Sequence, residues 1–166
     1  MTTIQKNRFQ KALYDSHYRR IYSICYRITG NQMDAEEVMQ DVFLKIFAHL
    51  NDLQEEKAFI TWSSNIAVRT AIDRLRKQKF IFEPIDGLSI AEDEPDEMPE
   101  LTVEGVKKAL NELPQGYRII VSLRLFEEYS FEDIAKTLQI KESSVRSQFA
   151  RGREKLAQKL KVKIEK

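Results

Sequence analysis

The polar side chains best suited to recognition chemistry lie near the end of the chain, in a segment over residues 143–160. At about 100° per residue, Val145, Phe149, Gly152, Leu156 and Leu160 fall on one side of a predicted helix, which we expect to face a core. The opposite side and its flanks carry groups that hydrogen-bond base edges and phosphates, namely Ser144, Arg146, Ser147, Gln148, Arg151, Arg153 and Lys155. The pattern predicts binding to duplex DNA, and the alternative is an ordinary solvated face of a packed helix.

The residues before this helix have the spacing of a helix-turn-helix. Ser130-Phe131-Glu132-Asp133 resembles a capping box, with Asp133 in place of the usual Glu or Gln, and begins a short helix that ends near Leu138. A turn of three residues, 139–141, then leads to the basic helix. In this motif the second helix lies in the major groove, so we expect the last third of the chain to bind DNA in that way.

A predicted helix over residues 58–79 has a second polar side. Trp62, Asn65, Arg69 and Arg76 fall together, away from the apolar side. An aromatic ring beside cations can stack on an unpaired base while the cations hold the backbone, so this side is a candidate for single-stranded nucleic acid. The alternative is that Trp62 simply closes the core.

A predicted helix over residues 33–50 has a polar side of a different kind. Opposite its apolar stripe lie Asp34, Glu37, Gln40, Asp41, Leu44 and Ala48. An exposed leucine among acids suits a protein partner better than DNA. The alternative is a scattered surface leucine, which is common and needs no function.

The elements that position these side chains are all helical in the sequence pattern. Helices are predicted near residues 9–28, 33–50, 58–79, 103–113, 117–126, 131–138 and 143–160, and no segment alternates as a strand does. Between them, residues 80–99 hold three prolines in an acid-rich stretch that is typical of a linker. We therefore predict an all-α fold of two small helical domains, 1–80 and 103–166, joined by an acidic flexible linker over 81–102.

Composition limits the class of protein. The 166 residues are 42% hydrophobic and 32% charged, which is typical of a folded soluble chain. No apolar run approaches the ~20 residues of a membrane helix, and the N-terminus lacks the apolar core of a signal peptide, so we expect a cytoplasmic protein. One cysteine and two histidines exclude a disulfide framework and a zinc cluster. No catalytic triad, phosphate-binding loop or metal-ligand cluster is present, so we predict no enzyme activity and no cofactor.

Taken together, the motifs from Phe9 to Leu160 resemble the extracytoplasmic-function sigma factors of bacterial RNA polymerase. The block from Asp34 to Phe43 is similar to the helix by which such factors hold the polymerase clamp coiled coil. This implies that the polymerase contacts are Asp34, Glu37, Gln40, Asp41 and Leu44. Phe59-Ile60-Thr61-Trp62 and the block from Ala71 to Arg76 resemble the segment that reads and melts the −10 element. The implied −10 residues, including the loop that captures a flipped base, are Asp52, Leu53, Gln54, Lys57, Trp62, Asn65, Arg69 and Arg76.

The C-terminal motifs resemble the domain of these factors that binds the −35 element. They are Leu113-Pro114, Tyr117-Arg118, the block Tyr129–Ala135, and Val145-Arg146-Ser147, and they imply −35 contacts by Ser144, Arg146, Ser147, Gln148, Arg151 and Lys155. The chain departs from the family pattern at several positions. Ser63-Ser64-Asn65 replace Leu-Tyr-Arg, Gln139 replaces Gly, Gln148 replaces Arg, and Gly152 replaces Ala.

The resemblance implies a sigma factor that binds core RNA polymerase and promoter DNA, with an anti-sigma factor or another recruiting protein as a further partner. It also implies that the acidic linker, with nine acids and no Lys or Arg over residues 80–106, threads toward the active-centre cleft as a mimic of nucleic acid. The main alternative is a two-domain helix-turn-helix regulator that binds duplex DNA without melting it. A second alternative is a helical adaptor whose basic faces bind protein or RNA.

Overall fold

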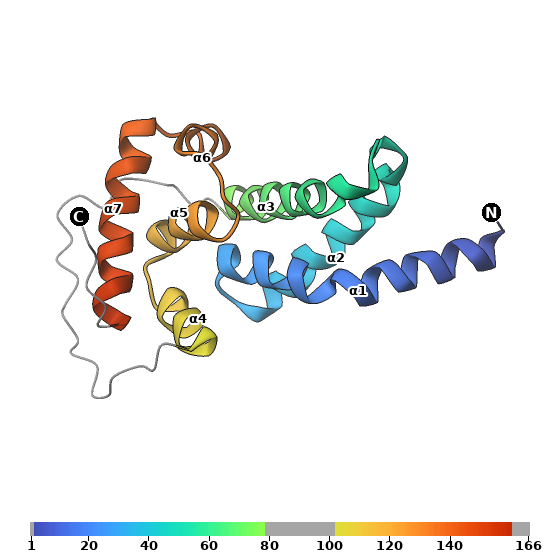
Figure 1. The fold of residues 1–166 in the computed structure, drawn as a ribbon, viewed down its shortest axis with the longest axis horizontal. Coiled ribbons are helices and arrows are strands. Elements are labelled where there is room, and N and C mark those ends of the chain that lie inside the picture. Colours follow the sequence, from blue (N-terminus) through green and yellow to red (C-terminus); the bar gives the residue numbers. More distant parts are fainter. Residues whose placement is uncertain (1, 79–101, 161–166) are drawn as a thin grey trace. The chain divides into compact units, whose positions relative to one another are not determined.

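The computed structural model describes residues 2–78 and 102–160, and every regular element in these ranges is a helix (Figure 1). The chain divides into two compact units, Met1–Phe80 and Ile81–Lys166. The predicted all-α fold with two helical domains is confirmed. Most of the predicted linker lies outside the described residues, and so does the acidic stretch assigned to nucleic-acid mimicry. In the two described ranges, no helix is long and apolar enough to cross a membrane.

The first unit is a bundle of three helices, each of which packs on the other two. They are α1 (Thr3–Thr29), α2 (Gln32–His49) and α3 (Phe59–Lys77), with two short 3-10 turns, Leu50–Asp52 and Glu56–Ala58, between the last two. The core is formed by the apolar stripes that the spacing predicts, and its largest fully buried side chains are Ile21, Ile28, Val38, Val42, Ile46, Val68 and Ile72. Burial of these side chains is the main force that holds the three helices together.

The ends of α1 follow from local chemistry. Thr2 and Gln5 form a reciprocal capping box at its start, and Gly30 ends it with a left-handed backbone at φ 80°. The helix therefore ends at Thr29, in the gap between the predicted helices near 9–28 and 33–50. The apolar face of α1 begins later than its sequence indicates, because Phe9 is 44% exposed and the fully buried residues start at Ile21.

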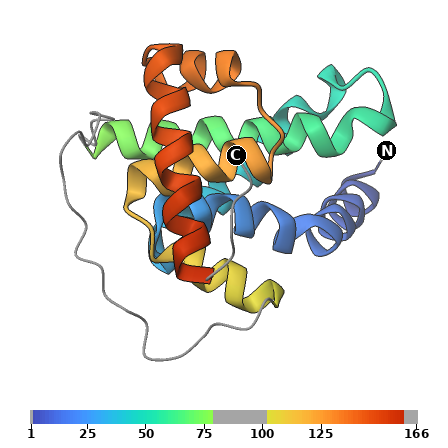
Figure 2. The same cartoon turned by 60° about the vertical axis from the view of Figure 1, so that its left-hand side comes forward.

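Over residues 102–160, the second unit forms four helices, α4 (Val103–Asn111), α5 (Gln115–Leu125), α6 (Phe131–Leu138) and α7 (Glu142–Leu160). Helix α7 packs on the other three, and Figure 2 shows it lying across α5 with α6 at its N-terminal end. The predicted break at 114–116 lies two residues earlier than expected, at 112–114, because α4 ends at Asn111 and α5 begins at Gln115 directly after Pro114.

The pair α6 and α7 has the predicted helix-turn-helix form. The Ser130 hydroxyl accepts from the Asp133 backbone nitrogen at 3.0 Å and caps α6. Gln139 ends α6 in a left-handed conformation at φ 58°, where the family usually has glycine. A residue with a Cβ is strained there by about 1–2 kcal/mol, which is the cost of this departure.

Candidate functional site

The acidic face, defined as Asp34, Glu37, Gln40, Asp41 and Leu44, lies along one side of α2. Its first member is fixed by the helix cap. Asn31 donates from Nδ2 to Asp34 Oδ2 at 2.7 Å, while its Oδ1 accepts from the Asp34 backbone nitrogen at 2.8 Å. Gln78 Nε2 donates to the same carboxylate at 3.4 Å. These hydrogen bonds, first of all the one from Asn31, hold the pKa of Asp34 below its usual range. Asp34 is therefore engaged within the unit.

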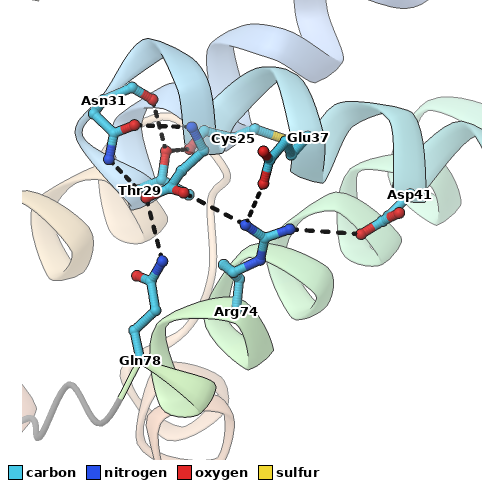
Figure 3. A network of polar contacts seen from close by, with 8 residues as sticks. Cys25, Thr29, Asn31, Glu37, Asp41, Arg74 and Gln78 are labelled. Carbon is cyan, nitrogen blue, oxygen red and sulfur yellow. Dashed lines mark hydrogen bonds and ion pairs between the residues drawn. The ribbon is translucent and has the colours of Figure 1, made fainter.

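Arg74 of α3 joins three carboxylates of the acidic face (Figure 3). One terminal nitrogen, Nη1, lies 2.8 Å from Glu37 Oε2 and 3.4 Å from Asp34 Oδ1. The other, Nη2, lies 3.9 Å from Asp41 Oδ2. The hydrogen bond to Glu37 is the main cause that raises the pKa of Arg74, so the guanidinium remains charged at any physiological pH.

The remaining members of the acidic face are presented to solvent. The Glu37 and Asp41 side chains are each 55% exposed, against 20% for Asp34, and Leu44 is 67% exposed. Leu44 borders an open groove of about 550 Å³ between α2 and α3, whose lining is Val38, Asp41, Leu44, Lys45, Thr70, Asp73, Arg74, Arg76 and Lys77. Lys45 of this lining was not predicted from the sequence, and its ammonium group donates to the Thr70 hydroxyl at 3.1 Å. The face thus offers carboxylates and one exposed apolar side chain to a partner.

The residues predicted for the −10 element lie on the loop after α2 and on α3. Asp52, Gln54 and Lys57 are exposed and Leu53 is half-buried. On α3, Arg69 is exposed, whereas Trp62, Asn65 and Arg76 are half-buried. The Trp62 ring lies 6.0 Å from the Phe59 ring, which in turn lies 4.7 Å from the ring of His17. Trp62 therefore sits at the edge of the core with part of its surface accessible.

Ser63 and Ser64, which follow Trp62, are buried and bind Arg20 of α1. Arg20 donates from Nη2 to Ser63 Oγ at 2.7 Å and from Nη1 to Ser64 Oγ at 2.6 Å. Its Nη1 also lies 3.3 Å from the carbonyl oxygen of Ile60. Arg20 was not predicted from the sequence. The signal that could have indicated such a residue is the pair of serines inside an amphipathic helix, because buried hydroxyls need hydrogen-bond partners.

On α7, the structure corrects one predicted DNA contact. Arg146, Ser147 and Arg151 are exposed and Ser144 and Lys155 are half-buried, but Gln148 is only 3% exposed. Gln148 faces α5, with its Oε1 3.8 Å from the position of a Cβ on Gly116. Its placement on the DNA-facing side was wrong, because Gln148 is turned toward α5 and is buried there. The Nε2 atom of Gln148 has no hydrogen-bond partner among the described residues.

Arg146 is held by two contacts at the start of α7. Its Nη2 lies 2.8 Å from Glu142 Oε1, and its guanidinium carbon lies 4.7 Å from the centre of the Phe131 ring. Arg124 lies over the same ring at 4.4 Å and donates to the Tyr129 carbonyl at 3.0 Å. Cation–π contact thus orders two guanidinium groups around Phe131. Neither Arg124 nor the contact of the Phe131 ring with two guanidinium groups was predicted from the sequence.

Over residues 2–78 and 102–160, no group of three or more His, Cys, Asp or Glu side chains is placed to hold a metal ion. Cys25 is fully buried in the core, and burial raises the pKa of its thiol to about 12, so it is protonated at neutral pH.

Comparison with known families follows the division into units. Residues 13–81 match sigma-70 region 2, and residues 104–156 match sigma-70 region 4. The RNA polymerase sigma factor SigV of Bacillus subtilis is 31% identical over 140 residues, which cover 82% of this chain and 81% of the relative. The ECF RNA polymerase sigma factor SigW of the same organism is 27% identical over 162 residues, which cover 89% of this chain and 87% of the relative. The chain belongs to the extracytoplasmic-function sigma factors of the sigma-70 family.

A solved structure agrees with this fold. The sigma factor RpoE of Bartonella quintana, determined in complex with the anti-sigma factor NepR, has a TM-score of 0.58 and 22% identity. The match covers 93% of this chain and 98% of that one.

Two departures of this sigma factor from the family pattern have structural causes. Ser63 and Ser64 are the acceptors of the Arg20 guanidinium, so polar contact between α1 and α3 replaces packing. Gly152 lies where α7 crosses α5, and a Cβ there would meet Val121 Cγ2 at 2.8 Å. The close approach of these two helices therefore requires glycine.

Proposed function

We propose that this sigma factor binds core RNA polymerase through the acidic face of α2. The observation that carries the proposal is the exposed Leu44 beside Glu37 and Asp41, because a surface of this composition suits a basic protein partner. Asp34 contributes by fixing the start of α2, and Gln40 lies exposed on the same side.

The first unit captures melted non-template bases of the −10 element. The exposed residues Asp52, Gln54 and Lys57, together with Leu53, form the loop beside which an unpaired base is held. The accessible part of Trp62 supplies a stacking surface, and Asn65, Arg69 and Arg76 lie on the same helix. Capture of this kind stabilises melted DNA without a chemical step, because an unstacked base costs a few kcal/mol that a pocket returns.

The second unit reads the −35 duplex with α7. Arg146, Ser147 and Arg151 are exposed on this helix, with Ser144 and Lys155 beside them, so they are available to base edges and phosphates. The helix-turn-helix places such a helix in the major groove. In this packing Gln148 supports α7 against α5 and does not reach DNA.

The partners of the factor are core polymerase, promoter DNA and an anti-sigma factor or another recruiting protein. The last of these has a precedent in the complex of Bartonella RpoE with NepR. The factor acts in the cytoplasm and is associated with the nucleoid through polymerase. The acidic segment 83–100 acts as a mimic of nucleic acid in the active-centre cleft of polymerase until RNA displaces it.

Charge reversal on the acidic face tests the proposal. Glu37→Lys with Asp41→Lys should abolish binding of core polymerase and leave the fold intact, because both side chains are more than half exposed. The matched control is Asp15→Lys with Glu104→Lys, which makes the same change in net charge at two exposed residues that are not members of the face. Equal binding by both double variants would exclude this face as the polymerase contact.

A further inference from the structure

Three carboxylates of the acidic face are arranged so that they repel one another. Asp34, Glu37 and Asp41 are spaced at i, i+3 and i+7 on α2, which puts one carboxylate on each successive turn of a single side. Without a counter-charge, each side chain would turn away from its neighbours, and their orientations would spread.

Arg74 supplies this counter-charge from another helix, and it reaches all three acids at once (Figure 3). The planar guanidinium has two terminal nitrogens, and here one serves Glu37 and Asp34 while the other serves Asp41. The Arg74 side chain is only 25% exposed, whereas Glu37 and Asp41 are each 55% exposed. The cation thus lies beneath the two acids that solvent and a partner can reach.

The sequence resemblance puts Arg74 in the segment that acts on the −10 element, together with Arg76. In the structure, Arg74 is directed to the carboxylates of α2. Arg76 lies 3.6 Å from Asp73 on its own helix.

We propose that Arg74 is a positioning residue for the polymerase interface, which holds Glu37 and Asp41 in the orientation that a basic partner meets. The proposal rests on the proposed function of the acidic face. Its physical basis is preorganisation, because side chains ordered before association lose less conformational freedom when the partner arrives.

Positioning and simple electrostatic attraction predict opposite changes in the affinity for polymerase when Arg74 is removed. Loss of one positive charge makes the face more negative, so Coulomb attraction alone predicts tighter binding to a basic surface. Positioning predicts weaker binding, because Glu37 and Asp41 then repel one another and must be ordered by the partner.

The experiment measures the dissociation constant of core RNA polymerase for full-length Arg74→Gln, Arg74→Lys and a control, Arg8→Gln. Arg8 is exposed on α1, away from the face, and its substitution removes the same charge. We expect Arg74→Gln to bind about three- to tenfold more weakly, Arg74→Lys to lie between it and the native protein, and Arg8→Gln to bind as the native protein does. Binding of Arg74→Gln that is unchanged or tighter would overturn the proposal.

The same substitution, made in a protein that already carries a change at Glu37, distinguishes a positioning role of Arg74 from a general loss of stability. In a protein that carries Glu37→Gln, the effect of Arg74→Gln should shrink markedly, because the main partner of the guanidinium is gone. General destabilisation of α2 or α3 would weaken binding by the same factor in both backgrounds, and that result would also overturn the proposal.

If Glu37→Lys with Asp41→Lys leaves polymerase binding intact, the proposed function of the face has failed. If that double variant abolishes binding while Arg74→Gln does not weaken it, only the role of Arg74 has failed.

Discussion

Two buried hydroxyls and one arginine join α1 to the start of α3. Ser63 is fully buried and Ser64 is 9% exposed, and both accept hydrogen bonds from Arg20 at 2.7 Å or less. Hydrogen bonds to a charged donor are stronger than neutral ones, and a buried hydroxyl without a partner is unfavourable. The contact therefore fixes the turn of α3 that carries Trp62.

We expect Arg20→Ala to lower the free energy of unfolding by about 1–3 kcal/mol, because it removes the shared donor of two buried oxygens. Urea unfolding of the native and variant proteins, followed by circular dichroism, measures the change. The adjacent Arg19 is exposed, and its guanidinium contacts the side chain of the neighbouring Tyr18, so Arg19→Ala should leave stability nearly unchanged. Equal effects of the two substitutions would show that the serine contacts do not matter.

At the scale of elements, α7 and α5 approach so closely that a side chain at position 152 has no room. The Cβ of an alanine there would lie 2.8 Å from Val121 Cγ2 and 3.2 Å from Tyr117 Cβ. Either α7 would have to move away or the two side chains would have to shift, and α7 carries the residues that we assign to the −35 element.

We predict that Gly152→Ala lowers the free energy of unfolding by about 1–3 kcal/mol through overpacking. The higher helix propensity of alanine offsets part of this cost, so a net gain in stability would contradict the close contact. Val121→Ala removes the nearest methyl group, and the cost of Gly152→Ala should therefore be smaller in that background. Thermal unfolding of the two single variants and the double variant gives the coupling energy directly.

The sequence predicts the elements well because their signals are local. The apolar spacing of residues 143–160, the serine cap at Ser130 and the glycine stop at Gly30 each depend on neighbours within a few turns. Gln148 shows the limit of such reasoning, because its burial depends on contact with α5, a helix that lies far from it in the sequence. Arg20 and Arg74 show the same limit, since each finds its partners about 40 residues away in the chain.

At the scale of the whole molecule, the two units have separate cores and separate surfaces. The first presents the acidic face of α2 and the accessible side of α3, and the second presents the polar side of α7. The two sigma-70 regions coincide with this division, since one match ends at residue 81 and the other begins at residue 104. We propose that different parts of one chain bind polymerase and the two promoter elements.

The most direct test of the account is run-off transcription by core RNA polymerase with the purified factor, on a fragmented library of the host genome. The account predicts that the factor binds polymerase and produces transcripts from discrete start sites preceded by shared −35 and −10 sequences. It also predicts that Glu37→Lys with Asp41→Lys removes these transcripts. A factor that binds duplex DNA but neither binds polymerase nor produces discrete starts would contradict the account.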